Sequence, residues 1–324
     1  MQKINRDILI EKAEKLFAEG TITRVLGWKK GEFDYDITPA LFSDEKSLRE
    51  EFVFSDFCGI NLSKYLVAKT KTAEGKILVF LKPCDTYSFN QLIKEHRIKR
   101  ENVYIVGVEC QGKFDVQHLN AKGIDFVDSV EETLDKVTVN GSIVLDRDEV
   151  KLERCTVCDK KHVVYDEIVE INEKIPSNKD RFELVKKLEG MTADERYEFW
   201  KSELSKCIRC NACRNVCPAC NCTKCVFDND DSTIASKANS DSFEEKLFHI
   251  IRSFHVAGRC TDCGECSRVC PQNIPLHLLN RKYISDVNEL YGEFHAGEDD
   301  HSKGPLTSFT KEDKDPTEAV RRGK

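Results

Sequence analysis

Two cysteine runs near the C-terminus constrain this chain more than any other feature. The first reads C-x2-C-x2-C-x3-C-P over residues 207–218, and the second repeats the same spacing over residues 260–271. This spacing is typical of proteins that bind pairs of [4Fe–4S] clusters, because three closely spaced thiolates hold one cluster and the fourth reaches the other. The two runs therefore predict two [4Fe–4S] clusters and a function in electron transfer.

The crossed arrangement also predicts which cysteines share a cluster. The first ligand set consists of Cys207, Cys210, Cys213 and Cys270. The second ligand set consists of Cys260, Cys263, Cys266 and Cys217. Structural zinc is the alternative, since C-x2-C pairs also bind zinc. Zinc sites usually combine two such pairs, however, and do not repeat four cysteines that end in proline, so the pattern favours iron.

The cysteine content indicates a reducing compartment. The 324 residues include 16 cysteines, and residues 1–20 have the pattern of a charged amphipathic helix. Four apolar residues fall on one face of that helix: Leu9, Ala13, Leu16 and Phe17. The segment lacks the apolar stretch and the cleavage site of a signal peptide. Because cytosolic thiols stay reduced, the pattern argues against a disulfide framework, and we expect a cytoplasmic protein.

Composition and motifs argue against several other classes of protein. The net charge is −7, so there is no overall basic field that would attract nucleic acid, and we expect no nucleic-acid partner. No apolar run approaches the roughly 20 residues that a membrane-spanning helix needs. The sequence also contains no G-x-G-x-x-G dinucleotide motif, no P-loop and no catalytic triad signature, so we assign no catalytic residue.

Residues 1–170 have the pattern of an α/β domain with a partly parallel sheet. Residues 76–81 and 103–108 are short apolar runs typical of buried strands, and residues 85–96 between them have a helical pattern. A strand, a helix and a second strand in this order predict a βαβ unit with parallel strands and a right-handed crossover.

The rest of the chain predicts a helical connector over residues 171–206, an α-helical dicluster ferredoxin-like domain over 207–290 and a mobile tail over 291–324. Thr192 and Glu195 form a capping-box signature at the start of one helix. A second helix follows Ser242, and its expected core-facing stripe comprises Phe243, Leu247, Ile250, Ile251 and Phe254.

A third cluster is predicted in the α/β domain. Cys84 follows the first strand of the βαβ unit and Cys110 follows the second, so both thiols should lie at the carboxyl edge of the sheet, where α/β sheets bind ligands. Cys84 would also lie at a helix N-terminus, which favours a thiolate. The C-x2-C pair of Cys155 and Cys158 would complete the ligands. Zinc and buried thiols without a metal are the alternatives.

Four cysteines remain: Cys58, Cys220, Cys222 and Cys225. The last three form a C-x-C-x2-C run directly after the first ligand run. They could contribute to a fourth metal site, a cluster or a zinc ion, with Cys58 as a further ligand. The alternative is that one or two of them pack against the first cluster and shield it.

The motifs at residues 82–85 (K-P-C-D), 107–112 (G-V-E-C-Q-G) and 155–159 (C-T-V-C-D) resemble the β-subunit family of coenzyme F420-dependent hydrogenases and dehydrogenases. In that family a P-C, a G-x-x-C and a C-x2-C contribute a [4Fe–4S] cluster beside a flavin. The resemblance therefore implies a cluster on Cys84, Cys110, Cys155 and Cys158. It also implies an FAD cofactor as a further candidate, although we assign no FAD-binding residues in this sequence.

The C-terminal part is similar to the iron–sulfur subunits of cytoplasmic sulfhydrogenase and anaerobic sulfite reductase. It is closer to the β-type subunits found with formate dehydrogenases and heterodisulfide-reductase-like modules, which share residues 195–200 (E-R-Y-E-F-W), the cysteine block over 207–225 and residues 254–260 (F-H-V-A-G-R-C). One departure is the position of the dicluster module, which usually lies at the N-terminus of F420-hydrogenase β subunits and lies C-terminally here.

The leading functional hypothesis is an electron-transfer subunit of a cytoplasmic anaerobic oxidoreductase complex. The resemblance implies as partners a formate dehydrogenase or hydrogenase catalytic subunit, a flavoprotein or heterodisulfide-reductase-like subunit, and soluble ferredoxin. The alternative is a flavin-containing subunit that exchanges hydride with coenzyme F420 or another soluble carrier and passes electrons to its clusters. A regulatory protein with structural zinc is the third hypothesis. Released flavin would distinguish the first two.

Overall fold

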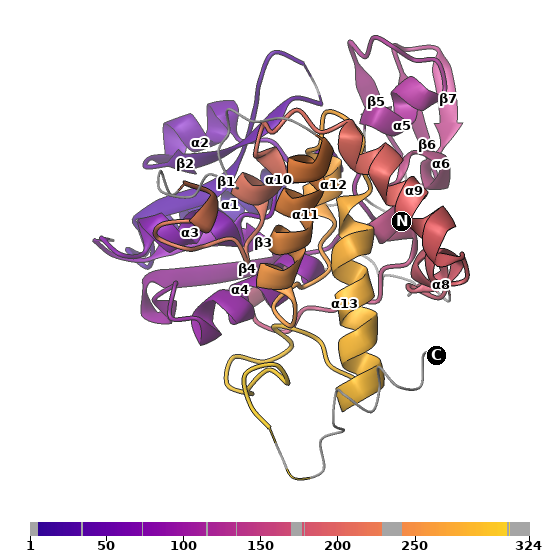
Figure 1. Cartoon of the computed structure of the whole chain (residues 1–324). Helices are drawn as coiled ribbons and strands as arrows, with labels where there is room; N and C mark the ends of the chain where they lie inside the picture. Colours follow the sequence, from indigo (N-terminus) through magenta and orange to yellow (C-terminus); the bar gives the residue numbers. More distant parts are fainter. Residues whose placement is uncertain are drawn as a thin grey trace. The chain divides into compact units, whose positions relative to one another are not determined.

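The computed structural model divides the chain into two compact units, residues 1–179 and residues 180–324 (Figure 1). For residues 242–245 only the backbone is described. The structure describes residues 6–33, 35–72, 74–114, 116–133, 135–169, 177, 179–228, 242–309 and 311.

The N-terminal unit is built on a five-stranded sheet with the strand order β2-β1-β3-β4-β8. Its strands are β1 (Arg24–Lys30), β2 (Ile37–Phe42), β3 (Ile77–Leu81), β4 (Val103–Val108) and β8 (Glu167–Val169). The β1–β2 pair is antiparallel, and the other neighbouring strands run parallel. The predicted α/β class with a partly parallel sheet is confirmed.

The predicted βαβ unit forms the centre of this sheet. All five residues of β3 are buried, as expected for an apolar strand covered on both faces. The crossover helix α4 (Pro83–Lys94) begins at Pro83, two residues earlier than its predicted start. In the register of the parallel pair, Val79 lies opposite Ile105. The chain therefore leaves β3 and β4 at the same edge.

Further helices complete the N-terminal unit: α1 (Arg6–Ala18), α2 (Glu45–Glu51), α3 (Ser63–Lys69) and α5 (Val116–Ala121). The buried side of α1 carries Leu9, Ala13 and Leu16, as predicted, and also Ile10. Phe52 and Phe80 contact each other in the core, with ring centroids 5.3 Å apart. This contact packs β3, the strand that precedes Cys84, against the core.

A smaller antiparallel sheet precedes the C-x2-C pair. Its strands are β5 (Val130–Glu132), β6 (Lys136–Val139) and β7 (Ile143–Asp146). The short helices α6 (Arg147–Val150) and α7 (Glu153–Thr156) follow this sheet. Cys155 lies in α7. Within the described residues, the 3-10 helices are η1 (Arg100–Asn102) and η2 (Val226–Asp228).

The described residues of the C-terminal unit form helices and loops, which confirms the predicted α-helical class. The helices are α8 (Glu183–Glu189), α9 (Ala193–Ser205), α10 (Ala212–Val216), α11 (Ser242–Val256), α12 (Glu265–Arg268) and α13 (Leu276–Tyr291). Helix α11 packs against α9 and α13. The predicted capping box is present at the start of α9, where Thr192 and Glu195 bond reciprocally.

The predicted core-facing stripe of α11 is wrong at two positions, whereas Ile251 packs against the core of the C-terminal unit as predicted. Ile250 is 41% exposed and Phe254 is 58% exposed. Phe243 lies outside the described side chains. The buried face of the helix instead carries Phe248, His249, Arg252, Ser253 and Val256. Apolar periodicity failed here because two large polar side chains face inward, toward the cysteines described below.

Residues 292–309 follow α13 without further helix or strand. Part of this segment packs on the C-terminal unit, because Ala296 is buried and Leu306 lies beside Gly258. Gly258 has a φ of +67° and ends the turn after α11, as its position before Cys260 predicts.

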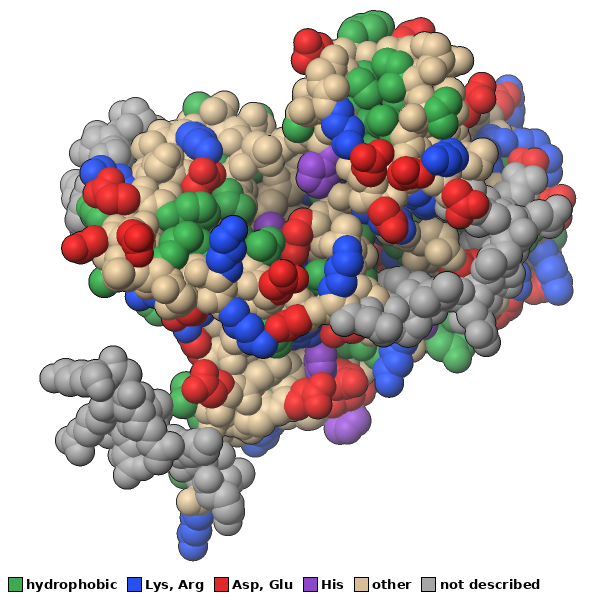
Figure 2. Space-filling view, turned by 90° about the vertical axis from the view of Figure 1, so that its right-hand side faces the viewer, with side chains coloured by type: hydrophobic (Ala, Val, Ile, Leu, Met, Phe, Trp, Pro, Cys, Tyr) green, Lys and Arg blue, Asp and Glu red, His purple; other side chains and the backbone are tan. Residues whose placement is uncertain are grey.

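The face of the molecule drawn in Figure 2 shows no dominance of one charge. On the face drawn in Figure 2, acidic and basic side chains are interspersed, in line with a net charge of −7. Among the described residues, no helix has both the length and the apolar character needed to cross a membrane.

The capping box of α9 gives a first testable prediction. Replacing Thr192 by Ala removes the hydroxyl that accepts from the backbone N–H of Glu195 at 3.3 Å. We expect the free energy of opening of α9 to fall by about 1 kcal/mol, measured as faster amide hydrogen exchange in that helix. Thr192→Ser keeps the hydroxyl and should exchange like the unaltered protein. Equal exchange in all three proteins would contradict the assignment of the cap.

Candidate metal centres

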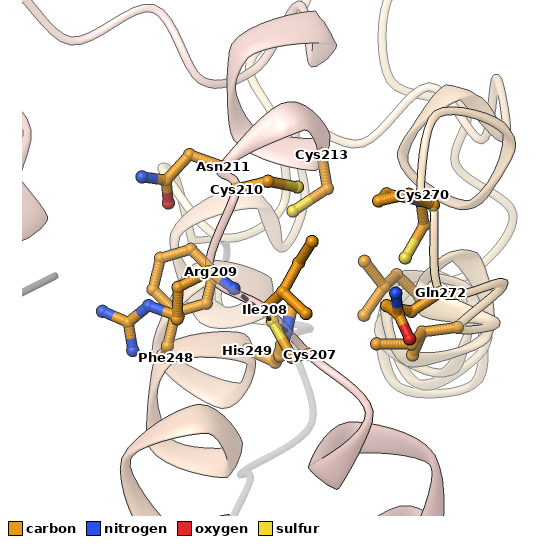
Figure 3. Close-up of a pocket in the computed structure, with 13 residues that line it drawn as sticks. Cys207, Ile208, Arg209, Cys210, Asn211, Cys213, Phe248, His249, Cys270 and Gln272 are labelled. Atoms are coloured by element: carbon orange, nitrogen blue, oxygen red, sulfur yellow. Dashed lines mark hydrogen bonds between the residues drawn. The ribbon is translucent and has the colours of Figure 1, made fainter. Parts of the chain in front are cut away.

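The four cysteines of the first ligand set surround one cavity in the C-terminal unit (Figure 3). Cys207, Cys210 and Cys213 come from the first run, and Cys270 comes from the second. In Figure 3, Cys270 lies across the cavity from Cys210 and Cys213, and its sulfur points into the space between them. The structure thus brings together the crossed combination, rather than four consecutive cysteines of one run.

The two cysteine runs share an unusual backbone conformation. Arg209 and Asn211 have φ angles of 54° and 62° in the first run, and Asp262 and Gly264 have 56° and 74° in the second. These pairs occupy equivalent positions, two and four residues after the first cysteine of each run. Left-handed residues turn the chain sharply. Each run therefore winds around its cysteines and then starts a short helix, α10 or α12.

Three cysteines of the second ligand set influence one another electrostatically. Burial raises the pKa of Cys260 far above its usual range, and Asp262, Cys217 and Cys266 add to this effect. Burial also raises the pKa of Cys266, to about 12, with Cys217 among the contributing thiols. Cys263, between them in sequence, is partly buried. Cys217 therefore lies near the second run, as the crossed arrangement requires.

Cys217 differs from its neighbours in its acidity. A hydrogen bond with the Cys220 side chain is the largest effect that lowers its pKa to about 6, and Arg252 contributes in the same direction. Ligation to iron requires a thiolate. A thiol that ionises near neutral pH is well suited to bind metal.

Several side chains and one backbone amide contact the candidate ligands. The imidazole Nε2 of His249 lies 3.2 Å from the Cys207 sulfur, and the backbone N–H of Arg209 donates to the same sulfur at 3.4 Å. Asn280 Nδ2 donates to the Cys266 sulfur at 3.7 Å. Hydrogen bonds to ligand sulfurs stabilise the more negative, reduced state of a cluster.

His249 is neutral in this environment. Burial, together with the positive charges of Arg252 and Arg209, lowers its pKa to about 3. The imidazole is therefore a hydrogen-bond partner of Cys207 and carries no charge at neutral pH. Sequence reasoning missed both His249 and Arg252, because the apolar residues of this helix predicted that a different face of it is buried.

The four cysteines of the third predicted ligand set lie in one neighbourhood near the carboxyl edge of the parallel sheet. Cys84 lies in the first turn of α4, directly after β3, and Cys110 follows β4. The electrostatic environment of Cys84 includes Cys110 and Cys158, and that of Cys155 includes Cys158. The structure therefore brings the four thiols into one neighbourhood of the N-terminal unit.

Backbone pairing brings the C-x2-C pair to this edge. Phe114 forms an isolated antiparallel bridge with Lys151, and Leu152 N donates to Lys113 O at 2.9 Å. The backbone N–H of Lys113 then donates to the Cys155 sulfur at 3.3 Å. Hydrogen bonds from the segment after Cys110 therefore hold Cys155 in position.

The prediction that Cys84 would be a stabilised thiolate is not met by the chain alone. Burial raises the pKa of Cys84 well above its usual value, and the adjacent carboxylate of Asp85 raises it further. The buried cation Lys113 opposes this effect. A helix N-terminus favours an anion only modestly, so desolvation dominates.

The leftover cysteines have different environments. The side chains of Cys220 and Cys217 form a hydrogen bond. Cys225 interacts with Arg214, and Cys222 is exposed. In the N-terminal unit, Cys58 is buried, and its sulfur contacts the backbone of Ser55 and Val53. Across the described parts of the chain, no three His, Cys, Asp or Glu side chains converge closely enough to hold a single metal ion.

The geometry agrees with the similarity of this chain to known proteins. Residues 203–274 match the family described as 4Fe-4S dicluster domain. The chain is 27% identical to the F420-dependent formate dehydrogenase subunit beta of Methanocaldococcus jannaschii, over 83% of this chain and 86% of that protein. It is 25% identical to the F420-dependent formate dehydrogenase 1 subunit beta of Methanococcus maripaludis, over 90% of each chain.

A further relative matches a shorter stretch of the chain. A ferredoxin from Sinorhizobium fredii is 34% identical over 24% of this chain and 76% of its own length. Together these similarities confirm the predicted dicluster domain and the predicted resemblance to iron–sulfur β subunits. Which cysteine binds which cluster stays a prediction.

The crossed ligand sets can be tested with three serine variants. If Cys217 serves the second set, Cys217→Ser should remove the cluster that Cys263→Ser removes, because both lose a ligand of the same site. The measurement is the iron content together with the electron paramagnetic resonance spectrum of the reduced protein. Cys210→Ser is the matched control for the first set. A spectrum of Cys217→Ser that matches Cys210→Ser would overturn the crossed assignment.

Proposed function

We propose that this chain, a homologue of the β subunits of F420-dependent formate dehydrogenases that carries a 4Fe-4S dicluster domain, relays electrons within an oxidoreductase complex. The main support is the cavity around which both cysteine runs place the four sulfurs of the first ligand set. A bound [4Fe–4S] cluster accepts and releases one electron at a time. In this proposal the chain converts no organic substrate of its own.

The protein side chains bind the clusters and tune their environment. The crossed ligand sets tie the two runs to each other, so that the sites depend on one folded unit. His249 and Asn280 contact ligand sulfurs from opposite sets. Contacts of this kind hold the ligands in place and set the energy of the added electron.

The proposal includes a third [4Fe–4S] cluster on Cys84, Cys110, Cys155 and Cys158. Its support is the shared neighbourhood of these thiols at the edge of the parallel sheet. The buried Lys113 lies among them, and its ammonium is fixed by the carbonyl of Gly59 at 3.2 Å. A cation in this position compensates part of the negative charge of four thiolates.

The partners follow from the names of the relatives. Two of them are formate dehydrogenase β subunits, so we propose that the chain assembles in the cytoplasm with a formate dehydrogenase-type catalytic subunit. A hydrogenase catalytic subunit, or a flavoprotein or heterodisulfide-reductase-like subunit, would use the same single-electron chemistry. Soluble ferredoxin is a further carrier with matching chemistry.

The leftover cysteines support a fourth metal site less well. The Cys220 thiol is hydrogen-bonded to Cys217, a predicted ligand of the second set, and Cys225 interacts with the guanidinium of Arg214. These contacts fit the shielding role better than a separate cluster. We therefore propose three clusters for the chain.

Cofactor analysis of protein purified without oxygen tests this function. Three four-iron clusters predict about 12 iron and about 12 acid-labile sulfide per chain. Cys84→Ser should reduce the iron to about 8, because one ligand of the third set is lost. The measurements are iron, sulfide and zinc, together with flavin released by acid precipitation.

Cys58→Ser is the matched control, since Cys58 is a buried cysteine of the same unit whose sulfur contacts backbone atoms. It should leave the iron content unchanged. About 8 iron in the unaltered protein would confine the clusters to the C-terminal unit. Stoichiometric flavin would contradict a pure relay and would support a subunit that exchanges hydride with F420 or another carrier. A colourless protein that contains zinc would rule out both functions.

A further inference from the structure

Arg252 is the most unusual charged residue of the C-terminal unit. It lies on the buried face of α11, and only 2% of its surface is exposed. Within the described part of the chain, its Nε and Nη1 atoms have no hydrogen-bond partner. Burying an arginine without a carboxylate is costly, so its position requires compensation from other groups.

The sulfurs of nearby cysteines provide that compensation when they are ionised. Burial alone would lower the pKa of Arg252, but the attraction of four cysteines raises it above its usual value. These cysteines are Cys266, Cys213, Cys217 and Cys220. A hydrogen bond joins the guanidinium to the Cys266 side chain.

The cysteines around Arg252 belong to both predicted ligand sets. Cys213 is a ligand of the first set, whereas Cys217 and Cys266 are ligands of the second. Helix α11 contributes His249 to the first set one turn earlier, through the contact with Cys207. Arg252 is therefore placed at the boundary between the two sites, and His249 is placed at the first alone.

The buried carboxylates near the second run already have their own arginine partners. Asp262 pairs with Arg281, with Oδ1 and Nε 3.2 Å apart. Glu265 pairs with Arg268, with Oε2 and Nη2 2.8 Å apart. The charge of each carboxylate is balanced locally. Arg252 differs because the groups that dominate its environment are sulfurs.

We propose that Arg252 is a shared counter-charge that raises the reduction potentials of both clusters of the dicluster domain. This inference rests on the proposed function, because it presumes that both ligand sets hold clusters. Four thiolates make each site anionic, and reduction adds a further negative charge. A fixed cation beside both sites stabilises each reduced state.

A redox titration of the full chain tests the inference. Arg252→Gln and Arg252→Met remove the charge in two different shapes, and either one that retains the iron and sulfide content is titrated under spectroscopic observation. At a fixed potential, the ratio of reduced to oxidised form should fall at least tenfold for both clusters. Tenfold corresponds to about 59 mV for a one-electron couple. Arg252→Lys keeps the charge and should restore most of the ratio.

Lys246→Gln is the control for charge loss on the same helix. Lys246 lies over the ring of Tyr197 at 5.4 Å and is partly exposed, so its removal should leave both ratios nearly unchanged. Several outcomes would overturn the proposal: unchanged ratios in the Arg252 variants, a change in one cluster only, a change equal to that of Lys246→Gln, or loss of iron in both neutral variants. In contrast, an unaltered protein without two clusters would overturn the proposed function itself.

Discussion

The structure of the C-terminal unit depends on holding the thiols of its two cysteine runs close together, several of them in the protein interior. Burial raises the pKa of Cys213 and raises that of Cys266 to about 12, because a desolvated thiolate next to other thiolates is strongly disfavoured. The chain alone therefore keeps Cys213, Cys260 and Cys266 protonated at neutral pH. A bound cluster would take the place of the protons and offset part of the thiolate charge, so cluster binding and the packing of this unit would be physically coupled.

The N-terminal unit meets the same constraint with a different architecture. Parallel strands bring Cys84 and Cys110 to one sheet edge, and a backbone bridge brings Cys155 next to Lys113. The cysteines there are not consecutive in sequence, and the fold alone makes them neighbours. In both units, a buried cation lies among the thiols, Arg252 in one and Lys113 in the other. The recurrence indicates that charge compensation is part of each site.

Sequence reasoning succeeded where spacing or periodicity carries geometric information. The cysteine runs predicted the dicluster domain, and the apolar strands predicted the βαβ unit and the edge at which Cys84 and Cys110 meet. It failed on α11, where Ile250 and Phe254 are exposed and Arg252 is buried. Hydrophobic periodicity assumes that the core is apolar. A helix that faces sulfur ligands breaks this assumption, because the inward positions need donors and charge, and such deviations are expected at functional sites.

The two cysteine runs also show how one backbone design can produce two different sites. Both runs use left-handed residues at equivalent positions, so their loops have the same conformation. The side chains at the first of these positions differ, because the first run has Arg209 and the second has Asp262. Arg209 lies over the ring of Phe248 at 4.3 Å, whereas Asp262 is paired with Arg281. Sites with the same geometry thus receive different charges, and charge near the ligands is one of the means by which a protein separates cluster potentials. Arg252 acts on both sites, and the difference between them must come from residues such as these, which each run supplies for itself.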